Sequence, residues 1–314
     1  APRLFSRLHR IGIMTGEADT PPRRFFDRPY LLLPLASLQW AGNVVAGRLA
    51  VGEIQPMQLA TLRWGIVFVV LVAVYGKSLA ADWQVMRRRP WYLLLLGTSG
   101  FTAFTALFYA AAHFTTGANM SIIQGAFPLF VFGLAWMVRG RPIGWVQALG
   151  IALALAGVFL VAIRGDLEVA RTLAFNLGDV FMLGTSVVYA IYTVGLEERP
   201  PVSALSFFVA MTGVAFLTSL PLLGAEIALQ PFTWPTPKGW LITAFVALFP
   251  SFFAQVFFIR GVELIGPARA GVFINLNPVF GAALAVVFLG EEVGWYQAVG
   301  LVLVMVGIVS AQRR

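Results

Sequence analysis

The chain holds 314 residues, of which 59% are hydrophobic and only 11% are charged, and its mean hydropathy is +0.83. Soluble domains carry roughly a quarter of charged residues, so this composition predicts a membrane protein. The net charge of +8 lies in short clusters between apolar runs, which indicates a lipid bilayer rather than nucleic acid as the partner. Because the chain has no cysteine and only two histidines, disulfides, thiol catalysis and most histidine-based metal sites are excluded.

The N-terminal segment, residues 1–29, contains six arginines and no long apolar run. A cleavable signal peptide needs an apolar core ahead of its cleavage site. We therefore expect these residues to form a cytoplasmic tail.

Ten apolar windows follow the tail. A membrane-spanning helix needs about 20 mostly apolar residues. The windows that meet this test are 30–49, 57–75, 91–112, 118–138, 143–163, 177–196, 202–223, 240–259, 268–289 and 295–311. The two longest connections, 76–90 and 224–239, leave no room for a soluble domain. The sequence therefore predicts an all-α integral membrane protein with ten transmembrane helices.

Lysine and arginine are distributed unevenly between alternate connections. With the N-terminus inside, 17 of the 22 basic residues lie in inside segments, 4 lie in outside segments, and Arg63 lies within a window. Basic loops stay on the cytoplasmic side of a membrane. This asymmetry predicts that both termini are cytoplasmic.

Two stretches of the chain repeat at a spacing of 150 residues: GRPIGWVQALG at 140–150 and GEEVGWYQAVG at 290–300. The residues that recur 150 positions later are Ala118, Pro128, Phe130, Leu134, Ala135, Gly140, Gly144, Trp145, Gln147, Ala148, Gly150, Leu153 and Gly157. Each half holds five windows, an odd number, so the second half enters the membrane in the opposite orientation, as in secondary transporters. We expect a first repeat at 30–163, a periplasmic connector at 164–176 and a second, inverted repeat at 177–311.

The two copies differ in charge, with Arg141-Pro142 in the first and Glu291-Glu292 in the second. Inverted orientation accounts for this difference, because it places the arginine at the cytoplasmic face and the glutamates at the outer face. Glycines at 150 and 157 and their counterparts lie on one helix face, and small residues permit close helix contact. We expect that contact within the fold, and contact between protomers is the alternative.

The run GPARAGVFINLNPVFGAALAVVFLGEEVGWYQAVGLVLVMVGIV (266–309) resembles the second EamA repeat of the drug/metabolite transporter superfamily. That pattern has a proline in the penultimate helix, then Leu-Gly-Glu, then a glycine-rich last helix. The first copy departs from it, with Arg139-Gly140-Arg141 in place of Leu-Gly-Glu. In length, number of windows and aromatic content, the chain further resembles the aromatic amino-acid exporters of this superfamily (the YddG-type branch).

The resemblance implies a ten-helix basket of two inverted five-helix repeats around a central cavity in the inner membrane. Spans 1, 3, 4, 6, 8 and 9 would line the cavity, and spans 2, 5, 7 and 10 would support it. Polar and aromatic residues in the lining spans are then the candidate substrate-binding residues: Gln39, Trp40, Asn43, Tyr109, Asn119, Gln124, Tyr189, Tyr192, Gln255, Asn275 and Asn277. The alternative for the amides is interhelical hydrogen bonding, and for the tyrosines ordinary packing.

Three mid-helix prolines, Pro128, Pro250 and Pro278, are candidate hinges. A proline inside a helix removes one backbone hydrogen bond and bends the helix. Broken helices expose backbone groups that transporters use at midplane sites. A static kink that only shapes the packing is the alternative.

Arg63 is the one charge well inside an apolar window. A charge within a membrane is a functional hypothesis by default. Because Arg63 lies in a supporting span near the outer interface, we expect instead a structural residue that extends to the interface or pairs with Glu53.

The absence of acidic residues from the middle of the windows restricts the class of transporter. No Asp or Glu lies at mid-span, which disfavours proton coupling and cationic drugs. Amides, hydroxyls and aromatic rings suit a neutral or zwitterionic solute. We expect an exporter of amino acids with bulky side chains that works by alternating access as a uniporter. A proton-coupled drug or metabolite antiporter and a solute channel are the alternatives. We expect no enzyme activity, no cofactor and no metal site, and either a monomer or a homodimer.

Overall fold

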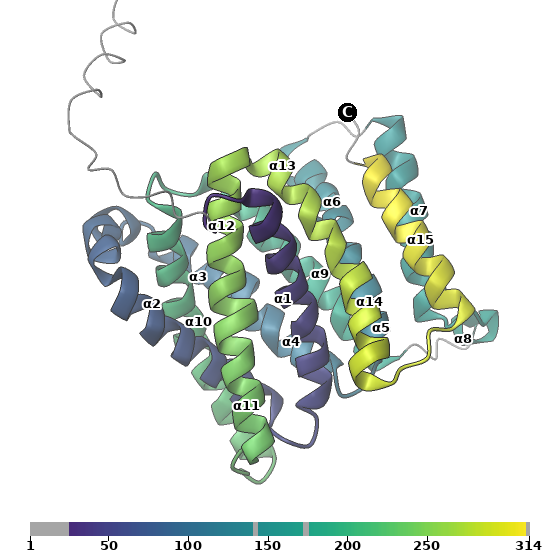
Figure 1. Ribbon diagram of the computed structural model, residues 1–314, viewed down its shortest axis with the longest axis horizontal. Helices are drawn as coiled ribbons and strands as arrows, with labels where there is room; N and C mark the ends of the chain where they lie inside the picture. Colours follow the sequence, from purple (N-terminus) through teal and green to yellow (C-terminus); the bar gives the residue numbers. More distant parts are fainter. Residues whose placement is uncertain (1–24, 141–143, 172–175, 312–314) are drawn as a thin grey trace, which may run out of the picture.

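The computed structural model describes residues 25–140, 144–171 and 176–311, and this part of the chain consists of helices and loops (Figure 1). Most of the predicted tail and Arg141-Pro142 therefore lie outside the described residues. The α-helices of the first half are α1 (Pro29–Leu49), α2 (Pro56–Met86), α3 (Pro90–Gly97), α4 (Phe104–Ala111), α5 (Gly117–Gly125), α6 (Phe127–Arg139), α7 (Trp145–Ala162) and α8 (Leu167–Arg171). Those of the second half are α9 (Leu177–Gly195), α10 (Ala204–Leu229), α11 (Pro237–Val246), α12 (Ala254–Ile265), α13 (Pro267–Gly271), α14 (Leu276–Leu289) and α15 (Trp295–Ala311).

Four short irregular helices complete the secondary structure: the π-helical η1 (Thr98–Ala103) and η3 (Ala247–Phe253), and the 3₁₀-helical η2 (Leu196–Glu198) and η4 (Val272–Asn275). The two π-helical segments stand about 150 residues apart, at equivalent places in the two repeats. They join α3 to α4 and α11 to α12, so the third and eighth predicted windows each contain the same interruption.

Each of the ten predicted windows coincides with a helix or a chain of helices. Eight of these, within the described residues, are long and apolar enough to cross a membrane. The helix α15 has 17 residues and is shorter than this test requires. The helix α1 is long enough but falls below the hydropathy of the eight, because Gln39 and Asn43 lie in its middle. The protein is therefore an all-α, multi-pass membrane protein.

Two predicted boundaries were wrong. The helix α2 continues to Met86 and α10 continues to Leu229, whereas the apolar windows ended at 75 and 223. Hydropathy marks the end of the hydrocarbon layer, and a helix with good formers beyond that point continues into the polar region. The predicted connector at 164–176 contains the short helix α8.

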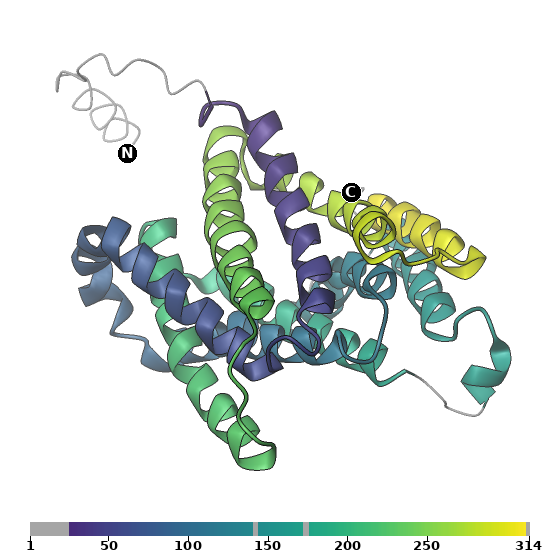
Figure 2. The same ribbon diagram turned by 60° about the horizontal axis from the view of Figure 1, so that its bottom comes forward.

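The packing of the helices follows the two-fold relation of the repeats. The pairs α2 with α10 and α7 with α15 each join equivalent helices of the two halves, and α5 with α14 joins the equivalent fourth and ninth windows. Likewise, α1 packs on α12 and α14, and its equivalent α9 packs on α4 and α6. Figure 1 shows the α7–α15 pair at one side of the bundle and α2 with α10 at the other, and α1 and α12 lie side by side in both Figure 1 and Figure 2.

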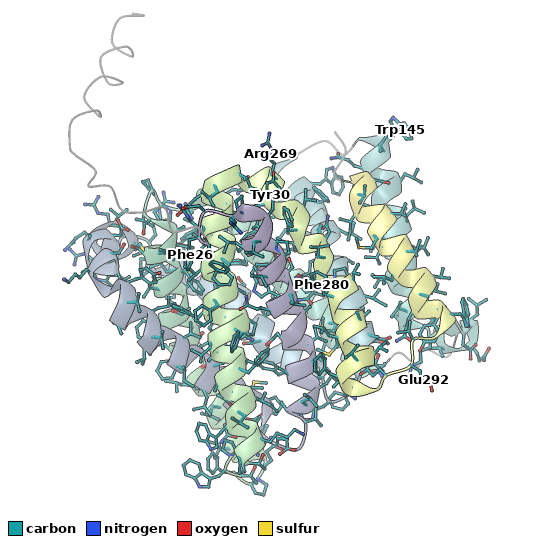
Figure 3. The ribbon with its side chains drawn as sticks, viewed as in Figure 1. Phe26, Tyr30, Trp145, Arg269, Phe280 and Glu292 are labelled. Atoms are coloured by element: carbon teal, nitrogen blue, oxygen red, sulfur yellow. The ribbon has the colours of Figure 1, made fainter. Side chains whose placement is uncertain are left out.

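The two copies of the repeated motif lie at opposite faces of the bundle. Each copy begins the last helix of its repeat, α7 in the first and α15 in the second. Gly140 and Gly290 both end a helix with a positive φ, 61° and 65°, a conformation that glycine adopts without strain. Figure 3 shows Trp145, at the start of α7, at the same face as Tyr30, whereas Glu292 lies at the opposite face.

The conserved spacing of glycine and glutamine within the two copies has a local cause. The Oε1 of Gln147 accepts a hydrogen bond from the backbone nitrogen of Gly144 at 3.1 Å, and Gln297 does the same for Gly294 at 2.8 Å. A side chain that reaches back from the third helical position satisfies an otherwise free donor at the helix start. The copies therefore share one helix-start geometry.

The expected glycine contact lies within the fold. A Cβ on Gly150 would lie 2.6 Å from the carbonyl oxygen of Gly307, and a Cβ on Gly157 would lie 2.7 Å from that of Gly300. The two contacts are exchanged by the two-fold relation of the repeats. They bring the backbones of α7 and α15 together as small residues do in membrane helix pairs.

Carboxylates near the end of one helix cap the start of its antiparallel partner in the α2–α10 pair. Glu226, near the end of α10, accepts hydrogen bonds from the backbone nitrogens of Met57 and Gln58 at 3.0 Å each. Asp82, near the end of α2, accepts one from the backbone nitrogen of Ser203 at 3.1 Å. An anion at a helix N-terminus meets free N–H groups and the positive end of the helix dipole. The two caps therefore hold the pair together at both ends.

The prediction that the two copies face opposite sides of the membrane can be tested by cysteine labelling, because the chain has no cysteine of its own. Trp145 and Glu292 are both exposed. We expect single variants Trp145→Cys and Glu292→Cys in whole cells to differ, with only position 292 modified by an impermeant maleimide from outside. Modification of both from the same side would contradict the inverted topology.

Candidate functional site

A buried polar cluster around Arg63 joins four helical segments of both repeats. Arg63 on α2 is 5% exposed. Its Nη1 donates to the Oδ1 of Asn43 on α1 at 3.2 Å and to the hydroxyl of Tyr109 on α4 at 2.6 Å. Its Nε donates to the Oγ of Ser251 on η3 at 2.5 Å. We call Arg63, Asn43, Tyr109 and Ser251 the central cluster. It contains two of the predicted binding residues.

Aromatic rings flank the guanidinium of Arg63. Its central carbon lies 4.8 Å from the ring centroid of Trp64 and 5.8 Å from that of Tyr109. Trp64 is itself fixed by a hydrogen bond of 3.1 Å from its Nε1 to the Oγ1 of Thr105. Cation–π contacts of this kind stabilise a cation that has left water. The rings and the hydrogen bonds therefore hold the guanidinium in one orientation.

The expectation that Arg63 extends to the interface or pairs with Glu53 was wrong. Glu53 instead accepts a hydrogen bond from the Thr236 hydroxyl and pairs with Lys238 at 3.1 Å. Thr236 and then Lys238 lower the pKa of Glu53 below its ordinary value. Among the described residues, no carboxylate lies within 4.0 Å of Arg63, whose three hydrogen-bond partners are all neutral. The cluster thus carries a positive charge that no carboxylate of the described residues neutralises.

The π-helical segment η3 positions one wall of the cluster. Pro250 has no N–H to continue the helix, and the backbone there widens to a π-turn. The carbonyl of Pro250 accepts a hydrogen bond from the Nε1 of Trp40 at 3.0 Å, and Ser251 donates to the carbonyl of Val246 at 2.5 Å. The break at Pro250 therefore orients Trp40 and Ser251 together, as a hinge or a fixed kink would.

Three of the predicted amides have an oxygen that lacks a donor within the described part of the chain. The Oε1 of Gln39, the Oε1 of Gln124 and the Oδ1 of Asn277 are buried and have no hydrogen-bond partner there. They lie on α1, α5 and α14, which pack on one another. A buried acceptor left unpaired costs about 1–3 kcal/mol. These oxygens are therefore suited to accept hydrogen bonds from water or from a solute.

A second aromatic group surrounds the two tyrosines of α9. Tyr189 packs on Phe127 with 4.9 Å between ring centroids, and Tyr192 packs on Phe101 at 5.4 Å. A Cβ on Gly100 would lie 2.4 Å from the ring of Tyr192, so that glycine in η1 makes room for the ring. These contacts fit the packing alternative as well as a binding role.

Asn119 belongs to a different network at the start of α5. Its Nδ2 donates to Asp179 at 3.4 Å and its Oδ1 accepts from Gln297 at 2.8 Å. Asp179 is 1% exposed and also accepts a hydrogen bond from the hydroxyl of Thr115 at 2.5 Å. The structure thus separates Asn119 from the central cluster.

The remaining predicted residues lie at or near helix breaks. Gln255 is half-buried at the start of α12, and Asn275 is buried in η4. Pro128 is at the start of α6, directly after the break that separates it from α5, and Pro278 is in the first turn of α14, after η4. A Cβ on Gly125 would lie 3.1 Å from Pro278. The breaks in the fourth and ninth windows therefore meet at one helix crossing.

Comparison with known proteins gives matches along nearly the whole chain. The model of the EamA-like transporter family matches residues 28–163 and 176–311. The uncharacterized transporter YdeK of Bacillus subtilis (strain 168) is 31% identical, with 88% of this chain and 94% of the relative covered. A probable terminal-alkyne amino-acid exporter of Streptantibioticus cattleyicolor is 26% identical, covering 90% and 92%. A solved crystal structure, 21% identical, has the same fold with a TM-score of 0.63 and covers 90% of this chain and 96% of its own.

Proposed function

The chain belongs to the EamA-like transporter family of the drug/metabolite transporter superfamily, and on that premise we propose that it exports amino acids with bulky side chains across the bacterial inner membrane. Transport proceeds by alternating access between two inverted repeats of five spans each, with both termini in the cytoplasm. The solute is driven by its own gradient, as in a uniporter.

The observation that carries this proposal is the set of unpaired amide oxygens at mid-span on α1, α5 and α14. An ammonium group supplies three donors and no acceptor, so it complements oxygens that lack donors. The aromatic rings that flank Arg63 and those of α9 offer apolar contacts to a bulky side chain. The amino-acid exporter among the relatives supports the same substrate class.

Paired helix breaks support the alternating-access mechanism. The π-helical η1 and η3 interrupt equivalent spans of the two repeats, and transporters place substrate sites at such interruptions between inverted repeats. Because each break belongs to one repeat, movement of one repeat against the other changes the side from which the site is reached.

The proposal can be tested by counterflow in proteoliposomes. We expect vesicles preloaded with Phe, Met or Thr to accumulate labelled Phe without an imposed pH gradient, whereas protein-free vesicles do not. A cationic dye should not exchange. Failure of every amino acid to exchange would overturn the substrate class, and strict dependence on a pH gradient would overturn uniport.

One observation favours the alternative of a proton-coupled antiporter. Asp179 is a buried carboxylate on α9 whose hydrogen-bond partners, Thr115 and Asn119, are neutral, and such groups relay protons in membrane transporters. In that case a pH gradient should accelerate flux in the wild type and should have no effect in the Asp179→Asn variant. Single-channel conductance in planar bilayers would instead indicate a solute channel.

A further inference from the structure

We propose that the guanidinium of Arg63 binds the carboxylate of the transported solute, so that an oxyanion of single charge is required for recognition. This inference rests on the proposed function, in that it assigns one end of the amino acid to a particular subsite. It also changes the role of the second span, which the family resemblance placed outside the lining of the cavity.

The first support is the charge of the central cluster. Arg63 is almost fully buried and bonds to Asn43, Tyr109 and Ser251. These partners satisfy hydrogen bonds of the guanidinium but do not neutralise it. A buried charge without a partner of opposite sign is strongly destabilising, and within membrane proteins such residues mark substrate pathways. A bound carboxylate supplies the missing opposite charge.

The second support is the donor inventory of Arg63. A guanidinium carries five N–H groups, and the three recorded hydrogen bonds leave from Nε and Nη1. The other amino group, Nη2, has no acceptor among the described residues and is not among the fully enclosed atoms that lack a partner. It therefore keeps two donors and some access. Arginine binds carboxylates through such paired N–H groups.

The third support is the rigidity of the guanidinium. Trp64 and Tyr109 flank it, and Thr105 fixes Trp64 from behind. A side chain held by rings and three hydrogen bonds cannot turn away to find another partner, so its free edge is directed at a fixed point. Preorganised donors lose little entropy when they bind.

The same cluster discriminates between classes of solute. One cation among neutral partners matches a single negative charge, whereas a phosphate dianion would leave a second charge unpaired. A solute that carries only a positive charge is repelled. The cluster thus selects carboxylates, and the unpaired oxygens of Gln39 and Asn277 suit the ammonium group of a zwitterion.

The test uses purified protein in proteoliposomes with labelled Phe and four unlabelled competitors. Phe and 3-phenylpropionate keep the carboxylate, whereas phenylalanine amide and phenethylamine lack it. We expect the two carboxylates to compete in the wild type and the other two to compete at least about tenfold more weakly, the effect of losing a hydrogen bond to a charged group. In the Arg63→Gln variant this difference should disappear, and Arg63→Lys should retain part of it.

A matched control is Arg260→Gln, since Arg260 on α12 pairs with Asp27 and Glu263 and makes no contact with the central cluster among the hydrogen bonds and ion pairs of the described residues. This variant should discriminate as the wild type does. Should Arg63→Gln fail to fold, the Tyr109→Phe variant takes its place, because it keeps the guanidinium and removes one of its hydrogen-bond partners. The competitor series in the wild type still tests whether recognition requires the carboxylate.

Binding of labelled 3-phenylpropionate to the purified protein separates the two proposals. Flux of Phe with equal competition by its amide would overturn the Arg63 subsite and leave amino-acid export standing. Binding of 3-phenylpropionate that Arg63→Gln abolishes, without flux of any amino acid, would support the subsite and overturn the proposed function. Neither flux nor binding would overturn both.

Discussion

Replacing Gly150 or Gly307 by leucine is expected to separate α7 from α15 and to lower the melting temperature of the purified protein strongly. A Cβ on Gly150 would lie 2.5 Å from the backbone nitrogen of Ala311 and 2.6 Å from the carbonyl oxygen of Gly307. Both atoms belong to the backbone, so no side chain can rotate to make room. Overpacking a close contact costs about 1–3 kcal/mol, and more where a backbone must move, so we expect about 3 kcal/mol. Fluorescence-detected thermal denaturation in detergent measures the effect.

A matched control lies on α6. A Cβ on Gly133 would meet no atom of the described residues within 4 Å, so Gly133→Leu adds the same side chain to a helix with room for it. We expect this variant to melt within a few degrees of the wild type. If Gly150→Leu melts there too, the close crossing of α7 and α15 is refuted.

Substituting leucine for Glu226 is expected to destabilise the α2–α10 pair by about 3 kcal/mol, from the loss of hydrogen bonds to a charged group and of a charge at a helix N-terminus. Glu226 is 8% exposed and accepts from the backbone nitrogens of Met57 and Gln58. Without it, both donors are left at a buried helix start. The Glu226→Gln variant keeps one acceptor and should lose about half as much. The apparent melting temperature of each variant gives the order.

An exposed glutamate provides the comparison. Glu263 pairs with Arg260 at 3.2 Å on the surface of the bundle, and exposed pairs contribute about 0–1 kcal/mol. The Glu263→Leu variant should therefore melt close to the wild type. Equal losses at positions 226 and 263 would show that the cap on α2 does not stabilise the fold.

Much of the architecture could be predicted from the sequence because its signals are local or repeated. Apolar length marks each helix, and the identities at a spacing of 150 predict which helices are equivalent. Close contact of the glycine faces at 150/157 and 300/307 was predicted to lie within the fold, and the geometry confirms it. The ends of α2 and α10 were missed because helix propensity continues where hydropathy falls.

The site was harder to predict because its contacts join residues far apart in the chain. Arg63 meets Ser251 across 188 positions, and nothing near either residue indicates the other. The one signal of the site in the sequence was the charge of Arg63 inside an apolar window. Its position near the end of that window led to the expectation that it extends to the membrane interface. Asn119 was predicted to bind substrate because it is a polar residue in a lining span. Its side chain instead bonds to Asp179 and Gln297 and lies outside the central cluster.

The ion pairs between the repeats have a consequence for how the two halves recognise each other. Arg48 pairs with Glu291 at one face, and Arg139 pairs with Glu197 and Glu198 at the equivalent place on the other. Every arginine of these pairs belongs to the first half and every glutamate to the second. Two copies of the first half would oppose arginine to arginine, and two copies of the second would oppose glutamate to glutamate. The charges at these two places therefore favour pairing of a first half with a second half over pairing of two like halves, even though both halves share the same repeated pattern.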